Sequence, residues 1–414
     1  MIIVKKPKIR FKGFTETWEQ RKLNEIADKV SEKNKNNEFS EPFTNSAEQG
    51  IISQKDYFDR EIVNNENLNG YYIVRNDDFI YNPRISVTAP VGPINRNRLG
   101  RNGVMSPLYT VFRTHDIDNL YLEFYFKTTK WHRFMKLNGD SGARFDRFTI
   151  SSTQFMKMPI PYPTLEEQQK IGEYFESLDT LITLHQRKCE NLKKLKKFML
   201  QKTFPQNGEN VPKIRFLGFT DTWEQRKLGD IVDRVTRKNT GLISNLPLTI
   251  SAQYGLIDQN VYFDRRVASK DISGYYLINN GEFAYNKSTS VDAPWGAIKR
   301  LNRYENGVLS TLYIVFKIKN NNDVNSDFLV SYYDTNIWHK GISEIATEGA
   351  RNHGLLNISP NDFFLTRLFI PCMIKEQEQI GSLFSKLDNL ITLHQSKCDN
   401  LKEVKKYMLQ NMFI

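Results

Sequence analysis

The sequence has few cysteines and no long apolar run, and each lack excludes a class of protein. Three cysteines among 414 residues are too few for the disulfide framework of a secreted scaffold, so we expect a reducing cytoplasm. No apolar run approaches the roughly 20 residues that cross a bilayer. The first residues also lack the apolar core and cleavage site of a secretion signal. We therefore expect a cytoplasmic protein with no membrane partner.

Motifs for catalysis and cofactor binding are missing as well. There is no GxxxxGK phosphate loop and no GxGxxG fingerprint, and the six histidines show no metal-ligand spacing with cysteines or carboxylates. Residues 82–84 (Asn-Pro-Arg) resemble the Asn-Pro-Pro-aromatic loop of adenine methyltransferases only superficially, and a second copy at residues 286–288 reads Asn-Lys-Ser. We therefore expect no enzyme active site, no metal and no cofactor.

The balance of charge is basic. Lysine and arginine number 58 against 47 acidic residues, which gives a net charge of +11 and a pI of about 9.2. A charge of this sign favours polyanionic partners, nucleic acid first and anionic membrane second. A chain of this length is also too long for one typical core and indicates two or more domains.

The sequence contains two copies of one unit, and each copy is about half of the chain long. Residues 7–15 recur at 212–220 with the shared pattern Pro-Lys-Ile-Arg-Phe-x-Gly-Phe-Thr, and Trp-Glu-Gln-Arg-Lys-Leu at 18–23 recurs at 223–228. Further matched pairs are 70–72 with 274–276, 89–96 with 293–300, 131–132 with 338–339, and 142–144 with 349–351. This is a tandem duplication and not a short-period solenoid.

Each copy closes on a segment with a heptad pattern, residues 171–199 and 380–408. Apolar residues fall at alternating spacings of four and three, and His185, Cys189, His394 and Cys398 continue the same stripe. A stripe of period 3.5 suits two long helices that pack along a shared seam. We expect the two copies to pair with each other as antiparallel helices. An ordinary amphipathic helix on a core, or pairing with a second chain, remains open. The seam histidines are expected to set register, with pH sensing or metal binding as alternatives.

Between its opening motif and its helix, each copy is expected to mix α and β structure. Residues 103–112 are rich in β-branched and aromatic residues and predict a strand. Aromatic residues at spacings of three and four predict helices at 121–136 and 328–342. Thr164, before two glutamates, is the expected N-cap of the first long helix.

These patterns predict an α+β protein with two pseudo-symmetric globular domains of mixed α/β structure, joined by two long helices in an antiparallel intramolecular coiled coil. The expected boundaries are 1–164 for the first domain, 165–204 for the first helix, 205–211 for a linker, 212–373 for the second domain and 374–414 for the second helix. A helix of about 36 residues is about 54 Å long, so two similar domains held apart by such helices could contact one duplex at two places.

Basic and amide side chains in Gly- and Asn-rich loops are the candidate DNA contacts. Glycine lets the backbone approach a phosphate, while Arg and Asn supply bidentate donors to guanine and adenine. The candidate residues are Asn82, Arg84, Arg96, Arg98, Arg101, Arg144, Arg147, Asn286, Lys287, Lys299, Arg300, Arg303, Arg351 and His353. The alternative is a set of solvated loops with scattered charge.

A comparison of the two copies separates these candidates by their expected role. Residues identical in both copies, such as Arg96 and Arg300, favour scaffold or phosphate contacts. Positions that differ inside matched loops, such as Arg84 against Ser288, favour base reading, although drift would produce the same differences.

Nearly the whole chain resembles the specificity subunits of type I restriction-modification enzymes. The likeness rests on the repeated openings at 8–15 and 213–220, the twin Leu-Ile-Thr-Leu-His-Gln segments at 181–186 and 390–395, and the duplicated layout.

The resemblance implies that each domain is a target recognition domain that reads one half of a bipartite double-stranded DNA sequence. It further implies that the helices set the spacer and dock two methyltransferase subunits, through which the restriction and translocation subunits join. Such subunits are not catalytic. The competing hypothesis is a non-catalytic nucleic-acid-binding scaffold or regulator that recruits partners through its coiled coil.

Overall fold

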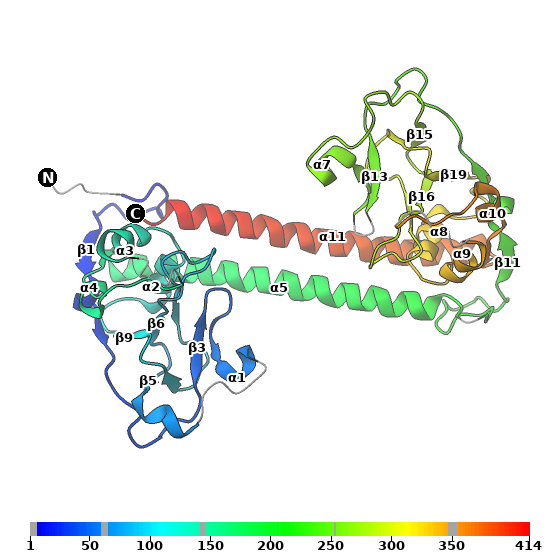
Figure 1. Ribbon diagram of the computed structural model, residues 1–414. Helices are drawn as coiled ribbons and strands as arrows, with labels where there is room; N and C mark the ends of the chain where they lie inside the picture. Colours follow the sequence, from blue (N-terminus) through cyan, green and yellow to red (C-terminus); the bar gives the residue numbers. More distant parts are fainter. Residues whose placement is uncertain (1–5, 59–64, 141–145, 207, 252–253, 347–353) are drawn as a thin grey trace. The chain divides into compact units, whose positions relative to one another are not determined.

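The chain divides into two compact units (Figure 1). In this computed structural model, residues 6–58, 65–140, 146–206, 208–251, 254–346 and 354–414 are described. Unit 1 consists of residues 1–186 and 396–414, and unit 2 of residues 187–395. Each unit therefore contains a β-rich head together with part of each of the two long helices.

The long helices are α5 (Leu165–Thr203) and α11 (Ile374–Asn411). The predicted N-cap of α5 is confirmed, because the Thr164 hydroxyl accepts a 3.4 Å hydrogen bond from the Glu167 backbone N–H. The predicted heptad stripe is buried along most of its length, as at Phe175 and Cys189.

The two helices run antiparallel within each unit, as predicted. In unit 1, Lys405 of α11 forms an ion pair with Asp179 of α5. In unit 2, Lys196 lies 2.7 Å from Asp388, so a later residue of α5 meets an earlier residue of α11. The coil is therefore intramolecular, and the seam does not need a second chain.

The head of unit 1 is built on a four-stranded antiparallel sheet in the order β2-β9-β6-β7. These strands are β2 (Ala27–Lys29), β9 (Thr110–Thr114), β6 (Phe79–Tyr81) and β7 (Ile94–Arg96). Three two-stranded pairs surround it: β1 (Glu19–Lys22) with β10 (Pro159–Tyr162), β3 (Phe43–Ser46) with β4 (Gly50–Ser53), and β5 (Tyr72–Val74) with β8 (Gly103–Met105). The short helices are α1 (Gln54–Tyr57), α2 (Asn119–Phe126), α3 (His132–Asn138) and α4 (Ser152–Phe155), with 3-10 turns η1 (Leu23–Glu25) and η2 (Asn65–Gly70).

The head of unit 2 repeats this topology. Its sheet has the order β12-β19-β16-β17, formed by β12 (Val232–Arg234), β19 (Ile314–Ile318), β16 (Phe283–Asn286) and β17 (Ala297–Arg300). The pairs are β11 (Glu224–Lys227) with β20 (Arg367–Ile370), β13 (Leu248–Ser251) with β14 (Gly255–Asp258), and β15 (Tyr276–Asn279) with β18 (Asn306–Leu309). The helices are α6 (Leu228–Ile231), α7 (Gln259–Phe263), α8 (Ser326–Tyr333), α9 (His339–Ile345) and α10 (Pro360–Leu365). The duplication read from the sequence is thus a duplication of fold.

The repeated opening motifs clamp each head onto the first turn of its long helix. Arg10 makes two hydrogen bonds to the buried Glu167 carboxylate, at 2.6 and 2.8 Å, and the Trp18 indole N–H donates a third at 3.0 Å. Arg215 holds Glu376 in the same way in unit 2, at 2.7 and 2.8 Å. Removing one partner of such a buried pair costs about 3–5 kcal/mol, so this clamp fixes the position of the head on the helix.

Three sequence predictions of single elements were wrong. The predicted strand at 103–112 is two strands, because the chain turns at Ser106, whose carbonyl accepts from the Tyr109 N–H at 3.0 Å. The predicted helix at 121–136 is α2 and α3. It breaks where the Thr128 hydroxyl donates to the Tyr125 carbonyl oxygen at 2.7 Å, and the predicted helix at 328–342 breaks equivalently into α8 and α9. In both copies a threonine hydroxyl thus bonds a carbonyl of the last turn of the first helix.

Candidate nucleic-acid interface

Each head has one long loop between two neighbouring strands of its central sheet. In unit 1 the β6–β7 loop spans residues 82–93, and in unit 2 the β16–β17 loop spans residues 287–296. Both loops carry the matched Ser-Val-x-Ala-Pro-x-Gly pattern and several of the predicted contact residues.

The tips of these loops are closed into tight turns. Ser86 and Ala89 exchange two backbone hydrogen bonds, at 3.0 and 3.2 Å, and Ser290 and Ala293 do the same at 3.1 Å each. In both turns the serine hydroxyl also accepts from the alanine N–H at 3.1 Å. Only two residues stand beyond each closing pair, so each tip is a short, internally bonded projection.

A valine occupies the first position of each tip, and both are fully exposed: Val87 at 101% and Val291 at 99%. Their partners at the second position are Thr88 and Asp292. An aliphatic side chain gains about 1.5–3 kcal/mol when it is removed from water. A fully exposed valine therefore stands at the same place in two internally bonded turns.

The base of each loop depends on a glycine. Gly92 has φ +84°, and a Cβ there would lie 2.1 Å from the Asn82 carbonyl oxygen; Gly296 has φ +77° and the same close approach to Asn286 at 2.2 Å. The Asn82 side chain in turn accepts from the Arg84 N–H at 2.9 Å. No other residue type fits this position without moving the loop.

A second segment pairs with the β6–β7 loop. The Ile85 N–H donates to the Asp146 carbonyl at 3.1 Å, and the Phe148 N–H donates to the Pro83 carbonyl at 2.7 Å. Arg84 and Arg147 become cross-strand neighbours. Both are exposed, and neither has a carboxylate partner among the residues that the structure describes.

Unit 2 has the same pairing with different side chains. The Leu356 N–H donates to the Lys287 carbonyl at 3.0 Å, and Ser288 lies opposite Leu355. The Lys287 ammonium donates to the Ile358 carbonyl at 3.3 Å, and burial lowers the pKa of this lysine. The same scaffold therefore presents two arginines in unit 1 and a serine and a leucine in unit 2.

Most of the other predicted contacts form ion pairs within their own unit. Arg96 and Arg98 lie 2.9 and 2.8 Å from the Glu123 carboxylate, and Arg98 also binds Glu176 at 2.8 Å. The hydrogen bonds from Arg98 lower the pKa of Glu176.

Arg101 follows the same pattern, with its partner Glu41 at 2.8 Å. In unit 2, Lys299 binds Asp334 at 2.7 Å and Arg300 binds Asp327 at 2.6 Å. Arg303 is exposed. Arg144, Arg351 and His353 lie outside the described residues.

Sequence reasoning missed the two tip valines. A signal was present, because the valine belongs to the Ser-Val-x-Ala-Pro-x-Gly pattern that both copies retain. Apolar residues between polar ones were not weighed as candidates, since base reading was sought among basic and amide side chains only.

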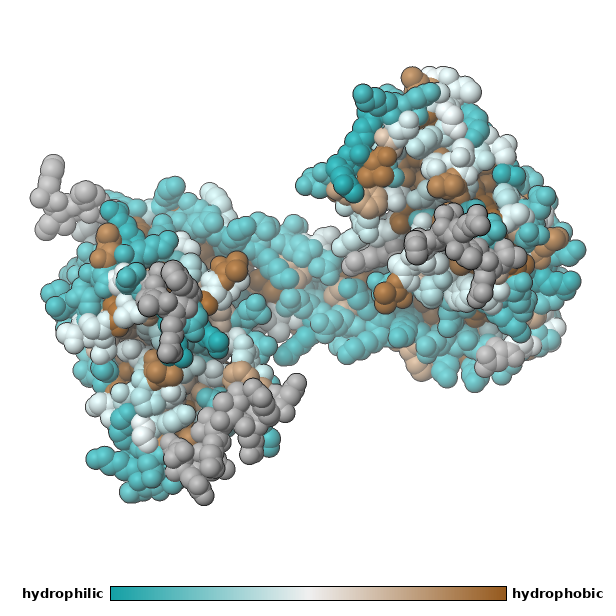
Figure 2. Space-filling view, in the orientation of Figure 1, coloured by the Kyte–Doolittle hydropathy of each residue, from teal (hydrophilic) through white to brown (hydrophobic). Residues whose placement is uncertain are grey.

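The described residues hold no group of three or more His, Cys, Asp or Glu that would suit a metal ion. No helix in the described part of the chain is long and apolar enough to cross a membrane. The face of the molecule in Figure 2 is mostly hydrophilic, and small apolar patches interrupt it.

Comparison with known proteins finds one family model that matches part of the chain and solved structures of similar fold. Residues 15–194 match the family model of the type I restriction modification DNA specificity domain. In structure, the chain is similar to the S subunit of a type I restriction-modification system from M. genitalium, with a TM-score of 0.59 and 11% sequence identity over 99% of both chains. The HsdS subunit from Thermoanaerobacter tengcongensis matches with a TM-score of 0.46 and 13% identity over 96% of both chains. The first of these matches supports the fold over the whole length of the chain.

Proposed function

We propose that this chain is a specificity subunit of a type I restriction-modification system and that it reads a bipartite DNA sequence, one half through each unit. In unit 1 the β6–β7 loop would enter a groove of the duplex, and in unit 2 the β16–β17 loop would do so. The resemblance in fold and the net charge of +11 both favour DNA as the partner.

The observation that carries this proposal is a pair of rigid loops that share a scaffold and differ in their side chains. Shared features, such as the glycine at the base and the valine at the tip, would hold and insert the loop. Differing features would read bases. In unit 1, Arg84 and Arg147 lie side by side and suit guanine, to which arginine donates bidentately.

The proposed direct DNA contacts are therefore a subset of the predicted residues. They are Asn82, Arg84, Arg147, Asn286, Lys287 and Arg303, together with the valine tips. The paired residues Arg96, Arg98, Arg101, Lys299 and Arg300 would hold the heads together, since a residue whose charge is already neutralised has less to offer a phosphate. Arg144, Arg351 and His353 stay predictions.

The long helices would dock two methyltransferase subunits. Four of the exposed apolar side chains on the long helices are matched between the units: Leu181, Leu184, Val404 and Tyr407 in unit 1, and Leu195, Phe198, Leu390 and Leu393 in unit 2. These are the same four heptad-related positions in both copies, and the leucines lie in the identical Leu-Ile-Thr-Leu-His-Gln segments. Two equivalent apolar sets would bind two copies of one partner.

The catalytic steps would belong to the other subunits. Methylation would be carried out by the docked methyltransferases, and cleavage by restriction and translocation subunits that join through the complex in the cytoplasm. The chain itself would set the spacer between the two half-sequences through its helices. A purified chain with methyl donor or Mg²⁺ should show neither activity.

Binding with the methyltransferase subunits present, on a target identified by methylation mapping and on random duplexes, tests the proposal. We expect preference for one split sequence. Equal affinity for all duplexes would support the non-specific scaffold hypothesis instead.

A further inference from the structure

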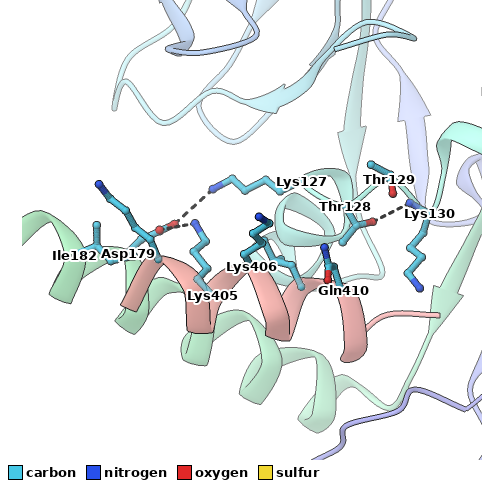
Figure 3. Close-up of a pocket in the computed structure, with 11 residues that line it drawn as sticks. Lys127, Thr128, Thr129, Lys130, Asp179, Ile182, Lys405, Lys406 and Gln410 are labelled. Carbon is cyan, nitrogen blue, oxygen red and sulfur yellow. Dashed lines mark hydrogen bonds and ion pairs between the residues drawn. The ribbon is translucent and has the colours of Figure 1, made fainter. Parts of the chain in front are cut away.

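Unit 1 contains a lysine-rich pocket that the recognition of bases does not use (Figure 3). Its volume is about 660 Å³, and it lies between the turn that follows α2 and the last turns of α11. Five lysines and one aspartate line it: Lys127, Lys130, Lys402, Lys405, Lys406 and Asp179. The lining therefore carries a formal charge of +4.

The single carboxylate in the pocket is already occupied. Asp179 is bound by Lys405, and the Lys127 ammonium lies 3.6 Å from it. Burial lowers the pKa of Lys405, and Lys127 lowers it further against the pull of Asp179. Lys130, Lys402 and Lys406 have no carboxylate partner in the described parts of the chain. Positive charge in this pocket thus exceeds what the protein itself neutralises.

The duplicated unit places a second carboxylate at the matched position. Lys196 takes the place of Lys405 on the other helix, and it binds both Asp388 and Asp334 at 2.7 Å. Asp334 stands four residues before the matched tryptophan, where unit 1 has Lys127. Burial would lower the pKa of Lys196, but the two carboxylates outweigh it and raise the pKa.

Lys405 therefore lacks the second carboxylate that Lys196 has in Asp334. Unit 1 has Lys127 at that position, and Lys127 pairs with Glu123 at 3.3 Å. Lys130 has replaced an apolar residue as well, because the matched position in unit 2 is Ile337. An external anion bound in the pocket would take the role that Asp334 has in unit 2.

The chemistry of the pocket fits a phosphate group. Lys130, Lys402 and Lys406 line the pocket without carboxylate partners among the described residues, and lysine binds phosphate as a point charge. The pocket also shares residues with its surroundings: Lys130 lines an adjacent hollow with Arg133, and Thr129 lines another with Pro90 of the β6–β7 loop and Lys136. Basic residues thus continue from the loop that we propose enters the DNA groove.

We propose that this lysine pocket holds a backbone phosphate of the DNA that unit 1 reads, and that unit 2 has no equivalent contact. This inference rests on the proposed function. Unit 1 would then contribute more of the sequence-independent affinity for DNA. The affinity of unit 2 would depend more on its contacts with DNA bases.

The test compares Lys402→Ala with Lys193→Ala, the same exposed helical position in unit 2, in the complex with its methyltransferase subunits. The dissociation constant is measured against salt concentration on target and random duplexes. We expect the log–log slope to become shallower by about 1 for Lys402→Ala, equally on both duplexes, and to stay unchanged for Lys193→Ala. Lys402→Arg should retain the wild-type slope. Equal slopes for the two alanine variants would overturn the proposal.

Two further arms identify the source of the anion. Inorganic phosphate at constant ionic strength should compete no better than chloride; strong competition in the wild type that Lys402→Ala abolishes would mean a free phosphate ligand and overturn a duplex contact. Loss of methyltransferase subunits from Lys402→Ala at unchanged slope would mean that the pocket binds an acidic protein segment, which would likewise overturn a duplex contact. A wild-type complex that binds both duplexes equally refutes the proposed function, whereas the slope contrast tests the pocket alone.

Discussion

The Cα of Gly92 lies so close to the Asn82 carbonyl that a Cβ on it would stand 2.1 Å from the oxygen, while its φ of +84° is a left-handed one. A real Cβ does not approach an oxygen this closely. The backbone conformation at the base of the β6–β7 loop therefore requires glycine at this position, and the position of the valine tip depends on it.

Gly92→Ala should destabilise the β6–β7 loop by about 2–4 kcal/mol, because it combines a left-handed alanine with a backbone clash. Gly100→Ala is the matched control: its φ is +69°, but no atom lies within 4 Å of the added Cβ. The control should lose only about 1–2 kcal/mol. Thermal unfolding measures both, and equal losses would mean that the contact with Asn82 yields at little cost.

Val87→Ser should weaken recognition of one half of the target and leave the other half unaffected. The side chain touches nothing in its own unit, so stability should not change. If the valine packs on thymine methyl groups, replacing thymine by uracil at the critical position should weaken DNA binding by the wild type and leave binding by the variant unchanged.

Val291→Ser supplies the control, since it should affect the opposite half-sequence. Methylation mapping after each substitution reads the two halves separately. Unchanged preference in both variants would show that the valine tips do not reach the bases.

Arg147→Ala should cost about 1–3 kcal/mol of specific binding if the arginine contacts a base, and it should leave unfolding unchanged because the side chain is exposed without a carboxylate partner in the described residues. Arg98→Ala should instead destabilise the fold and leave specific binding unchanged. That arginine joins Glu123 to Glu176, and its loss leaves the nearly buried Glu123 less well paired. Binding isotherms and unfolding curves for both variants distinguish the two roles.

Leu184→Glu should remove one docked methyltransferase, because a carboxylate would replace an exposed leucine in a proposed apolar contact. Leu393→Glu should remove the other copy, and the double variant both. Leu108→Glu, at an equally exposed leucine of the unit 1 head, is the control. Native mass spectrometry counts the subunits; two copies retained by the double variant would place docking elsewhere.

The duplication and the paired helices could be predicted because both are written as regular patterns along the chain. A stripe of period 3.5 needs no knowledge of distant residues, and Cys189 is buried where that stripe places it. The Thr164 cap is equally local. The predictions of short elements failed where the chain turns inside a periodic pattern, as it does at Thr128 between α2 and α3.

The partners of charged residues could not be predicted in this way. Glu167 looked like a residue placed for the helix dipole, but it receives Arg10 from 157 positions away. Arg98 looked like a free cation in a loop, and its partner Glu176 is 78 positions distant. Sequence gives the type of a side chain and its local element, whereas neutralisation depends on which carboxylate the fold brings near.

Lys405 should react with an amine-acylating reagent much faster than Lys196 at mildly alkaline pH. Both side chains are similarly covered, with 18% and 15% exposed, so access is matched. Burial lowers the pKa of Lys405, whereas two carboxylates raise that of Lys196 above its usual value despite burial. The neutral amine is the nucleophile, and Lys405 loses its proton first as pH rises.

The same shifts give the sign of the stability change. A lysine whose pKa is raised on folding stabilises the fold fully below the unfolded value of about 10.4, and this contribution is lost as pH rises through the folded pKa. Unit 2 should therefore keep its Lys196 network well into the alkaline range. Asp334→Asn should remove one of the two carboxylates and raise the acylation rate of Lys196 toward that of Lys405, measured by mass spectrometry of the modified peptides. A rate that does not change would mean that Asp388 alone holds the proton on Lys196.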